Sequence, residues 1–219
     1  MGACVVLCCG SSFSTLYSHS TLLPQPDENI TIVSGLPRSG TSVLMKMLAA
    51  GGLPPLTDGI READADNPGG YYEFEKVKQL ERDTAWLESA RGKAVKVISQ
   101  LLDQLPLHKP YKIVFALRKM DEILASQQAM LARRGQPRDR VADAEMAAAF
   151  GRHLNAVQQW LAEHPQMEVL YVNYAAVLRD PLATSREIKD FLALPLDVQQ
   201  MASVVDESLY RQRASILPH

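Results

Sequence analysis

Residues 30–48 read ITIVSGLPRSGTSVLMKML, and this stretch decides the fold. A run rich in β-branched residues begins at Ile30 and stops before Gly35, and an apolar pattern of helical period begins after Gly40. The sequence therefore predicts a strand, a tight glycine-containing turn and a helix. From Gly35 to Ser42 the turn has the G-x-x-x-x-G-T-S spacing of a phosphate-binding P-loop, in which backbone N–H groups and the helix start attract an anion.

The loop lacks the lysine of a nucleoside triphosphatase. Thr41 occupies the position at which a Walker A motif has its lysine, and Arg38 is the only basic residue inside the loop. The loop is therefore predicted to bind phosphate, but not to support the usual ATP or GTP chemistry.

The composition is that of an ordinary globular protein. Of the 219 residues, 47% are hydrophobic and 22% are charged, with a formal net charge of −2. Because no basic surface dominates this composition, we expect no bulk binding to nucleic acid, and any anion site has to be a local pocket. The length suits one compact α/β domain, which we place at residues 30–219.

The first 29 residues differ from the rest and are predicted to be a loosely packed or non-native extension. They hold all three cysteines, Cys4, Cys8 and Cys9, and no charged residue precedes Asp27. The apolar run at 3–9 is too short to span a bilayer, so no transmembrane segment is expected here. Since no cysteine follows Cys9, a disulfide framework is excluded, which favours a reducing, cytoplasmic location.

Strands and helices are predicted to alternate along the remaining chain. Further strands are expected at 94–98, 112–117 and 168–172, and helices at about 75–89, 121–133 and 146–161, after Pro181, and once more beyond residue 197. This order is typical of a three-layer α/β fold of the P-loop NTPase-like kind, with a mostly parallel sheet covered by helices on both faces.

In such a sheet the ligand lies at the carboxyl ends of the strands. Arg118 ends the strongest predicted strand, and Ser126 lies eight residues later, about two turns into the next helix. Each alone is more typical of a solvated surface. Together with a phosphate loop on a neighbouring strand, they indicate a second anion site, since guanidinium and hydroxyl groups both donate to phosphate. Two sites at one edge suggest a ligand with two separated phosphate groups.

These motifs resemble those of the sulfotransferases that use 3′-phosphoadenosine-5′-phosphosulfate (PAPS), with more similarity to bacterial and Golgi-type members than to cytosolic ones. The resemblance also includes NPGGYYEFE, VKVISQLL, YVNYAAVLRDP and VVDESLYRQR. It implies that Arg118 and Ser126 bind the 3′-phosphate, that Arg211 is a further cofactor-binding residue, and that no metal is needed. It also implies that the 5′-phosphosulfate is bound by the loop residues Gly35, Pro37, Arg38, Ser39, Gly40, Thr41 and Ser42.

The resemblance leaves the catalytic base to be found. The catalytic histidine of cytosolic members falls on Ile98 here, whereas Lys96 keeps the lysine that touches the transferring sulfuryl group. Golgi-type relatives use a glutamate after the first helix, and this chain offers Glu73 and Glu75 there. We favour Glu73, because Glu75 is also explained as a negative charge in the first turn of the predicted helix. Arg38 and Lys96 are the expected electrostatic catalysts.

The sequence thus predicts an enzyme that transfers a sulfuryl group from PAPS to a hydroxyl or amine of a small-molecule or carbohydrate-like acceptor, leaving 3′,5′-adenosine bisphosphate. A P-loop kinase of small metabolites is the alternative enzyme, although it would need a loop lysine and a magnesium-binding acidic residue. A nucleotide-binding protein without turnover is the third hypothesis.

Overall fold

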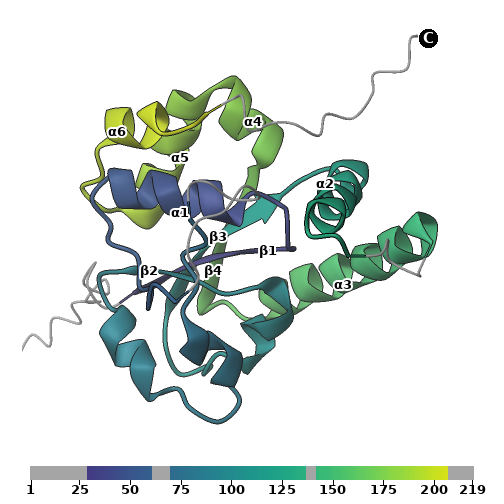
Figure 1. Ribbon diagram of the computed structural model, residues 1–219. Helices are drawn as coiled ribbons and strands as arrows, with labels where there is room; N and C mark the ends of the chain where they lie inside the picture. Colours follow the sequence, from purple (N-terminus) through teal and green to yellow (C-terminus); the bar gives the residue numbers. More distant parts are fainter. Residues whose placement is uncertain (1–28, 61–69, 137–141, 207–219) are drawn as a thin grey trace, which may run out of the picture.

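The fold is built on one parallel sheet. The computed structural model describes residues 29–60, 70–136 and 142–206, and in them four strands pair in the order β2-β1-β3-β4 (Figure 1). The strands are β1 Ile30–Gly35, β2 Ala94–Lys96, β3 Tyr111–Leu117 and β4 Met167–Asn173. All three pairings are parallel, so the carboxyl ends of the strands share one edge. The four strands predicted from the sequence are confirmed.

Helices cover both faces of the sheet (Figure 1). The α-helices are α1 Thr41–Ala50, α2 Met120–Arg133, α3 Asp143–Glu163, α4 Tyr174–Arg179, α5 Pro181–Leu192 and α6 Val198–Ser203. The short 3₁₀ helices are η1 Glu75–Gln79, η2 Ala85–Ala90 and η3 Ser99–Gln104.

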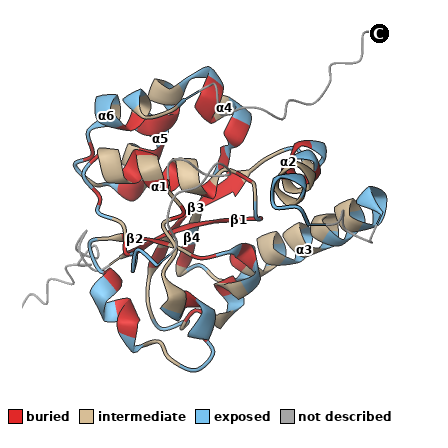
Figure 2. Ribbon diagram, in the orientation of Figure 1, coloured by how far each residue is buried: buried red, intermediate tan, exposed pale blue. Residues whose placement is uncertain are grey.

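The two faces of the sheet have separate cores, because successive strand residues point in opposite directions. Ile32 of β1 belongs to a core that includes residues of η1, η2, η3 and α3, whereas the next residue, Val33, belongs to a core with α1, α4, α5 and α6. Figure 2 shows buried residues along β1 and β3 and in parts of the helices around them. The predicted three-layer α/β architecture is therefore confirmed.

The predicted helix at 75–89 is wrong. In its place lie the two 3₁₀ helices η1 and η2, separated by a turn. The Asp83 carboxylate accepts a hydrogen bond from the Ala85 N–H at 2.9 Å, and the Trp86 indole donates to the Asp83 carbonyl at 3.1 Å. Such local side-chain bonds give the backbone an alternative to helical pairing, which explains why the apolar spacing did not produce one helix.

The helix predicted to open at Pro181 is confirmed as α5, and the short helix α4 before it was not predicted. Asn173 caps α4 by accepting from the Ala175 N–H, and Asp180 caps α5 by accepting from the Ala183 N–H, both at 2.9 Å. The N-terminal extension up to residue 28 and the segment 207–219, which contains Arg211, lie outside the described residues. None of the helices in the described ranges combines the length and the apolar character that crossing a bilayer requires.

We expect Leu87→Ala to lower the free energy of unfolding by about 2–5 kcal/mol, because it removes a large side chain from a closed core. Leu87 is 0% exposed, whereas Leu107 is 49% exposed and gives a matched control. Leu107→Ala should change the free energy by less than about 0.5 kcal/mol. Urea denaturation of the three proteins measures both values, and equal losses would contradict the assignment of Leu87 to the core.

Candidate functional site

The loop after β1 is held very close to β3. Gly35 has φ +146°, and a Cβ atom there would lie 2.6 Å from Ser39 Oγ and 2.8 Å from the Ala116 carbonyl oxygen. Only glycine fits such an approach. The Ser39 side chain is buried, 1% exposed, and its Oγ has no hydrogen-bond partner among the described residues. A buried hydroxyl without a partner is costly, so this loop contains a donor suited to a bound anion.

Arg38 connects the loop to α2. Its backbone is in the left-handed region at φ 69°, and its Nε donates to Ser126 Oγ at 3.0 Å. Ser126 lies on the second turn of α2 and is buried. The single cation of the loop and the serine predicted from the Arg118 spacing therefore lie together at the carboxyl edge of the sheet.

Arg118 contacts both the loop and α2. One of its terminal nitrogens donates to the Arg38 carbonyl oxygen at 3.1 Å, and its Nε donates to Glu122 Oε2 at 3.0 Å. The guanidinium carbon is 4.6 Å from the centre of the Tyr174 ring, within the range of a cation–π contact. Hence the structure brings Arg38, Arg118 and Ser126 together, with Arg38 bonded to both of the others.

Tyr174 also closes the loop from the side of β4. A Cβ atom on Gly40, which has φ +108°, would lie 2.5 Å from Cδ2 of the Tyr174 ring. Burial raises the pKa of the Tyr174 hydroxyl, and the nearby charge of Arg118 opposes this shift. The sequence motifs did not identify Tyr174 or Glu122 as site residues. The available signals were the position of Tyr174 immediately after a strand and the i, i+4 spacing of Glu122 from Arg118.

Lys96 joins the loop to a second segment. Its Nζ donates to Ser42 Oγ at 3.1 Å and to the Tyr71 carbonyl oxygen at 2.9 Å. Ser42 is in the first turn of α1, whereas Tyr71 belongs to the segment that contains the two candidate glutamates. A lysine ammonium has three donors, so one lysine can bind both neighbours and place a positive charge between them.

The two candidate glutamates differ in their surroundings. The Glu75 carboxylate forms an ion pair with Lys78 at 2.7 Å at the start of η1, the position that a charge in the first turn would take. Glu73 is partly buried, and its carbonyl oxygen accepts from the Thr57 hydroxyl at 2.9 Å. The Glu75 N–H donates to the Asp58 carboxylate at 2.6 Å, and this bond holds the pKa of Asp58 below its usual value. The segment around Glu73 is thus tied to residues 57–58.

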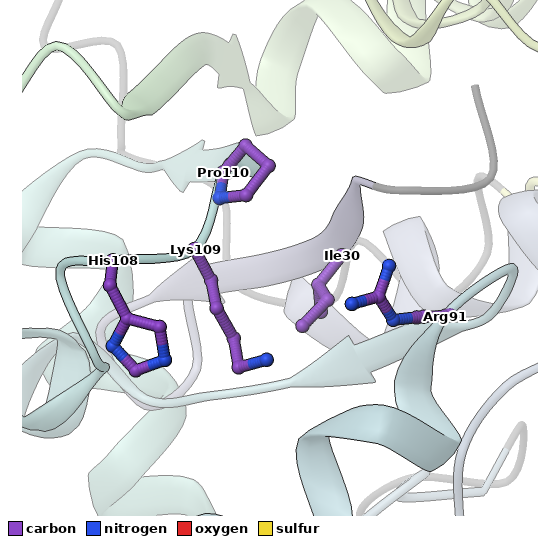
Figure 3. Close-up of a pocket in the computed structure, with 5 residues that line it drawn as sticks. All are labelled: Ile30, Arg91, His108, Lys109 and Pro110. Carbon is purple, nitrogen blue, oxygen red and sulfur yellow. The ribbon is translucent and has the colours of Figure 1, made fainter. Parts of the chain in front are cut away.

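A separate pocket lies at the opposite edge of the sheet. It is lined by Ile30, Arg91, His108, Lys109 and Pro110, and Figure 3 shows these side chains around the amino end of β1. Both Arg91 and Lys109 are paired with the Glu88 carboxylate. Because this pocket is at the amino edge, we do not assign the ligand site to it. Within the described part of the chain, no three His, Cys, Asp or Glu side chains gather as a metal site requires.

The chain matches the model of a known protein family. The model described as "Sulfotransferase family" matches residues 72–198, more than half of the chain. The matched region contains Lys96, Arg118 and Ser126, and it begins after the loop at 35–42. No curated protein matches the sequence.

Solved structures share the fold. The sulfotransferase domain of the olefin synthase of Synechococcus PCC 7002 has a TM-score of 0.50 and 18% identity, over 87% of this chain and 89% of that one. Sulfotransferase STF1 from Mycobacterium tuberculosis H37Rv has a TM-score of 0.53 and 17% identity, over 87% of this chain and 77% of that one.

We expect Gly40→Ala to destabilise the protein more than Gly52→Ala does. Both glycines have a positive φ, 108° and 101°, so alanine strains the backbone at each by about 1–2 kcal/mol. Only at Gly40 would the new Cβ also meet Tyr174, which should add roughly 1–3 kcal/mol of overpacking. Urea denaturation tests the difference, and equal losses at the two positions would show that Tyr174 does not close the loop.

Proposed function

This chain belongs to the sulfotransferase family, and we propose that it transfers a sulfuryl group from PAPS to a hydroxyl or amine of an acceptor, using the residues at the carboxyl edge of its sheet. The observation that carries the proposal is the contact of Arg38 with Ser126 and Arg118. It joins a phosphate loop without a Walker lysine to a second anion-binding pair. Such a pair of sites suits a nucleotide with phosphate groups at both its 5′ and 3′ positions.

The donor groups present fit PAPS. The buried Ser39 hydroxyl, which no described residue satisfies, and the hydroxyls of Thr41 and Ser42 would hold the 5′-phosphosulfate together with the loop N–H groups. Arg118 and Ser126 would hold the 3′-phosphate, and Arg211 remains a proposed contact beyond the described residues. Gly35, Pro37 and Gly40 would shape the loop around the anion.

PAPS supplies an activated sulfuryl group whose departure leaves negative charge on the 5′-phosphate. Arg38 and Lys96 supply positive charge at the loop and at its boundary with the segment that contains Glu73, and a preorganised donor of this kind is typically worth a hundredfold or more in rate. Glu73 would accept the proton of the acceptor hydroxyl or amine as the new O–S or N–S bond forms. The ion pair of Glu75 with Lys78 supports the choice of Glu73 over Glu75.

We propose a small-molecule or carbohydrate-like acceptor that approaches the segment around Glu73. Two stretches that lack periodicity in the sequence, 51–70 and 135–140, are the proposed determinants of its identity. The hydrogen bonds of Thr57 and Asp58 to the backbone of residues 73 and 75 support the first of them. A cytoplasmic location is proposed from the position of all cysteines before residue 10.

We expect 3′,5′-adenosine bisphosphate to bind without metal and more tightly than ATP with magnesium. Arg38→Ala should weaken this binding about tenfold to a hundredfold, because it removes a charged hydrogen-bond donor. Arg152→Ala, at an exposed arginine of α3, is the matched control and should leave the affinity unchanged. Isothermal titration calorimetry measures all of these. A preference for ATP with magnesium would instead favour the small-metabolite kinase.

We expect Glu73→Gln to abolish the transfer of labelled sulfate from PAPS to an acceptor, with bisphosphate affinity retained, because glutamine keeps the shape but cannot take the proton. Glu75→Gln is the control and should keep most of its activity, since its carboxylate pairs with Lys78. Loss of transfer in Glu75→Gln but not in Glu73→Gln would make Glu75 the base. Tight bisphosphate binding with no transfer in the wild-type chain, over a broad acceptor panel, would favour a nucleotide-binding protein without turnover.

A further inference from the structure

Among the described residues, Glu122 is the one acidic residue that is buried. Its side chain is 3% exposed, and that of Arg118, four residues earlier, is 8% exposed. Taking two such charges out of water is expensive, and an apolar pair of similar size is often as stable. A buried ion pair beside a ligand site therefore points to a role other than stability.

The bond to Glu122 acts on the Arg118 guanidinium together with contacts to Arg38 and Tyr174. Glu122 Oε2 accepts from Nε at 3.0 Å, the Arg38 carbonyl oxygen accepts from a terminal nitrogen at 3.1 Å, and the guanidinium carbon lies 4.6 Å from the centre of the Tyr174 ring. The guanidinium is a rigid planar fork, so fixing two of its donors also fixes the directions of its other N–H groups.

The same bonds also act on the loop. Because the Arg38 carbonyl is bonded to Arg118, the left-handed conformation of Arg38 is stabilised, and this conformation accompanies the contact of the Arg38 side chain with Ser126. Glu122 thus acts on the loop through Arg118 without needing to touch a ligand itself. Loss of its charge would leave Arg118 with one anchor fewer at a buried position.

We propose that Glu122 is a positioning residue, which orients Arg118 so that the site discriminates nucleotides with a 3′-phosphate from those without one. This inference rests on the proposed function, in which Arg118 binds the 3′-phosphate. It adds a residue that acts through Arg118, and it explains why a negative charge is tolerated so near an anion site. The Glu122 carboxylate, which Arg118 neutralises, fixes the orientation of the guanidinium, and the guanidinium then binds the 3′-phosphate.

The test is the ratio of two affinities, that for 3′,5′-adenosine bisphosphate over that for adenosine 5′-monophosphate, measured by calorimetry. Glu122→Gln should lower this ratio at least tenfold, because a misplaced Arg118 guanidinium no longer strengthens the binding of the nucleotide with a 3′-phosphate. Should Glu122→Gln fail to fold, Glu122→Asp is the second variant. It keeps the negative charge on a side chain that is one methylene shorter, and it should also lower the ratio. Asp121→Asn, at the exposed neighbour in the same helical turn, is the matched control and should leave the ratio unchanged.

A ratio is the appropriate readout because a purely structural effect lowers stability and both affinities together. A lower melting temperature with an unchanged ratio in both Glu122 variants would overturn the inference. A higher ratio in Glu122→Gln would overturn it too, since Glu122 would then compete with phosphate for Arg118. A wild-type chain that does not distinguish the two nucleotides would overturn the proposed function and this inference with it.

Discussion

The close approach of two strand ends, at Gly35 of β1 and Ala116 of β3, is the constraint on which the site depends. These residues are direct partners in the parallel pairing, and a Cβ atom on Gly35 would lie 2.8 Å from the Ala116 carbonyl. The loop after β1 and the polar residues after β3 therefore start from nearly the same place. As a result, a terminal nitrogen of Arg118 lies within hydrogen-bond distance, 3.1 Å, of the Arg38 carbonyl oxygen. The backbone pairing of β1 and β3 by itself therefore brings the two segments of the candidate site together.

The loop at 35–42 lacks a Walker lysine, and three strands bring positively charged side chains to its surroundings. Arg38 follows β1, Lys96 ends β2 and Arg118 follows β3. Each forms at least one hydrogen bond to another part of the site, so the cations are held apart at fixed positions. Holding charges in place before a ligand arrives is what makes them effective, because little reorganisation is then needed when charge develops.

The sequence predicted the strands and most helices well, because the alternation of continuous apolar runs and helical spacing is a strong local signal. It failed at residues 75–89, where the Asp83 turn interrupts a pattern that periodicity alone could not distinguish from one helix. At the site, the spacing of Arg118 and Ser126 was sufficient to bring them to one edge, but not to show that Arg38 would bond to both. Those contacts depend on a left-handed residue and on helix orientation, which no short motif encodes.

Lys96 connects the two halves of the site. Its ammonium group bonds both to Ser42 in the first turn of α1 and to the carbonyl of Tyr71, two residues before Glu73. The position of the segment that contains Glu73 is therefore linked to that of the loop through one cation. If a ligand on the loop draws this ammonium toward its own charge, the bond to Tyr71 has to lengthen or its segment has to follow. The lysine that supplies charge to the loop is thus also in a position to relate the binding of a ligand there to the placement of Glu73, the proposed base.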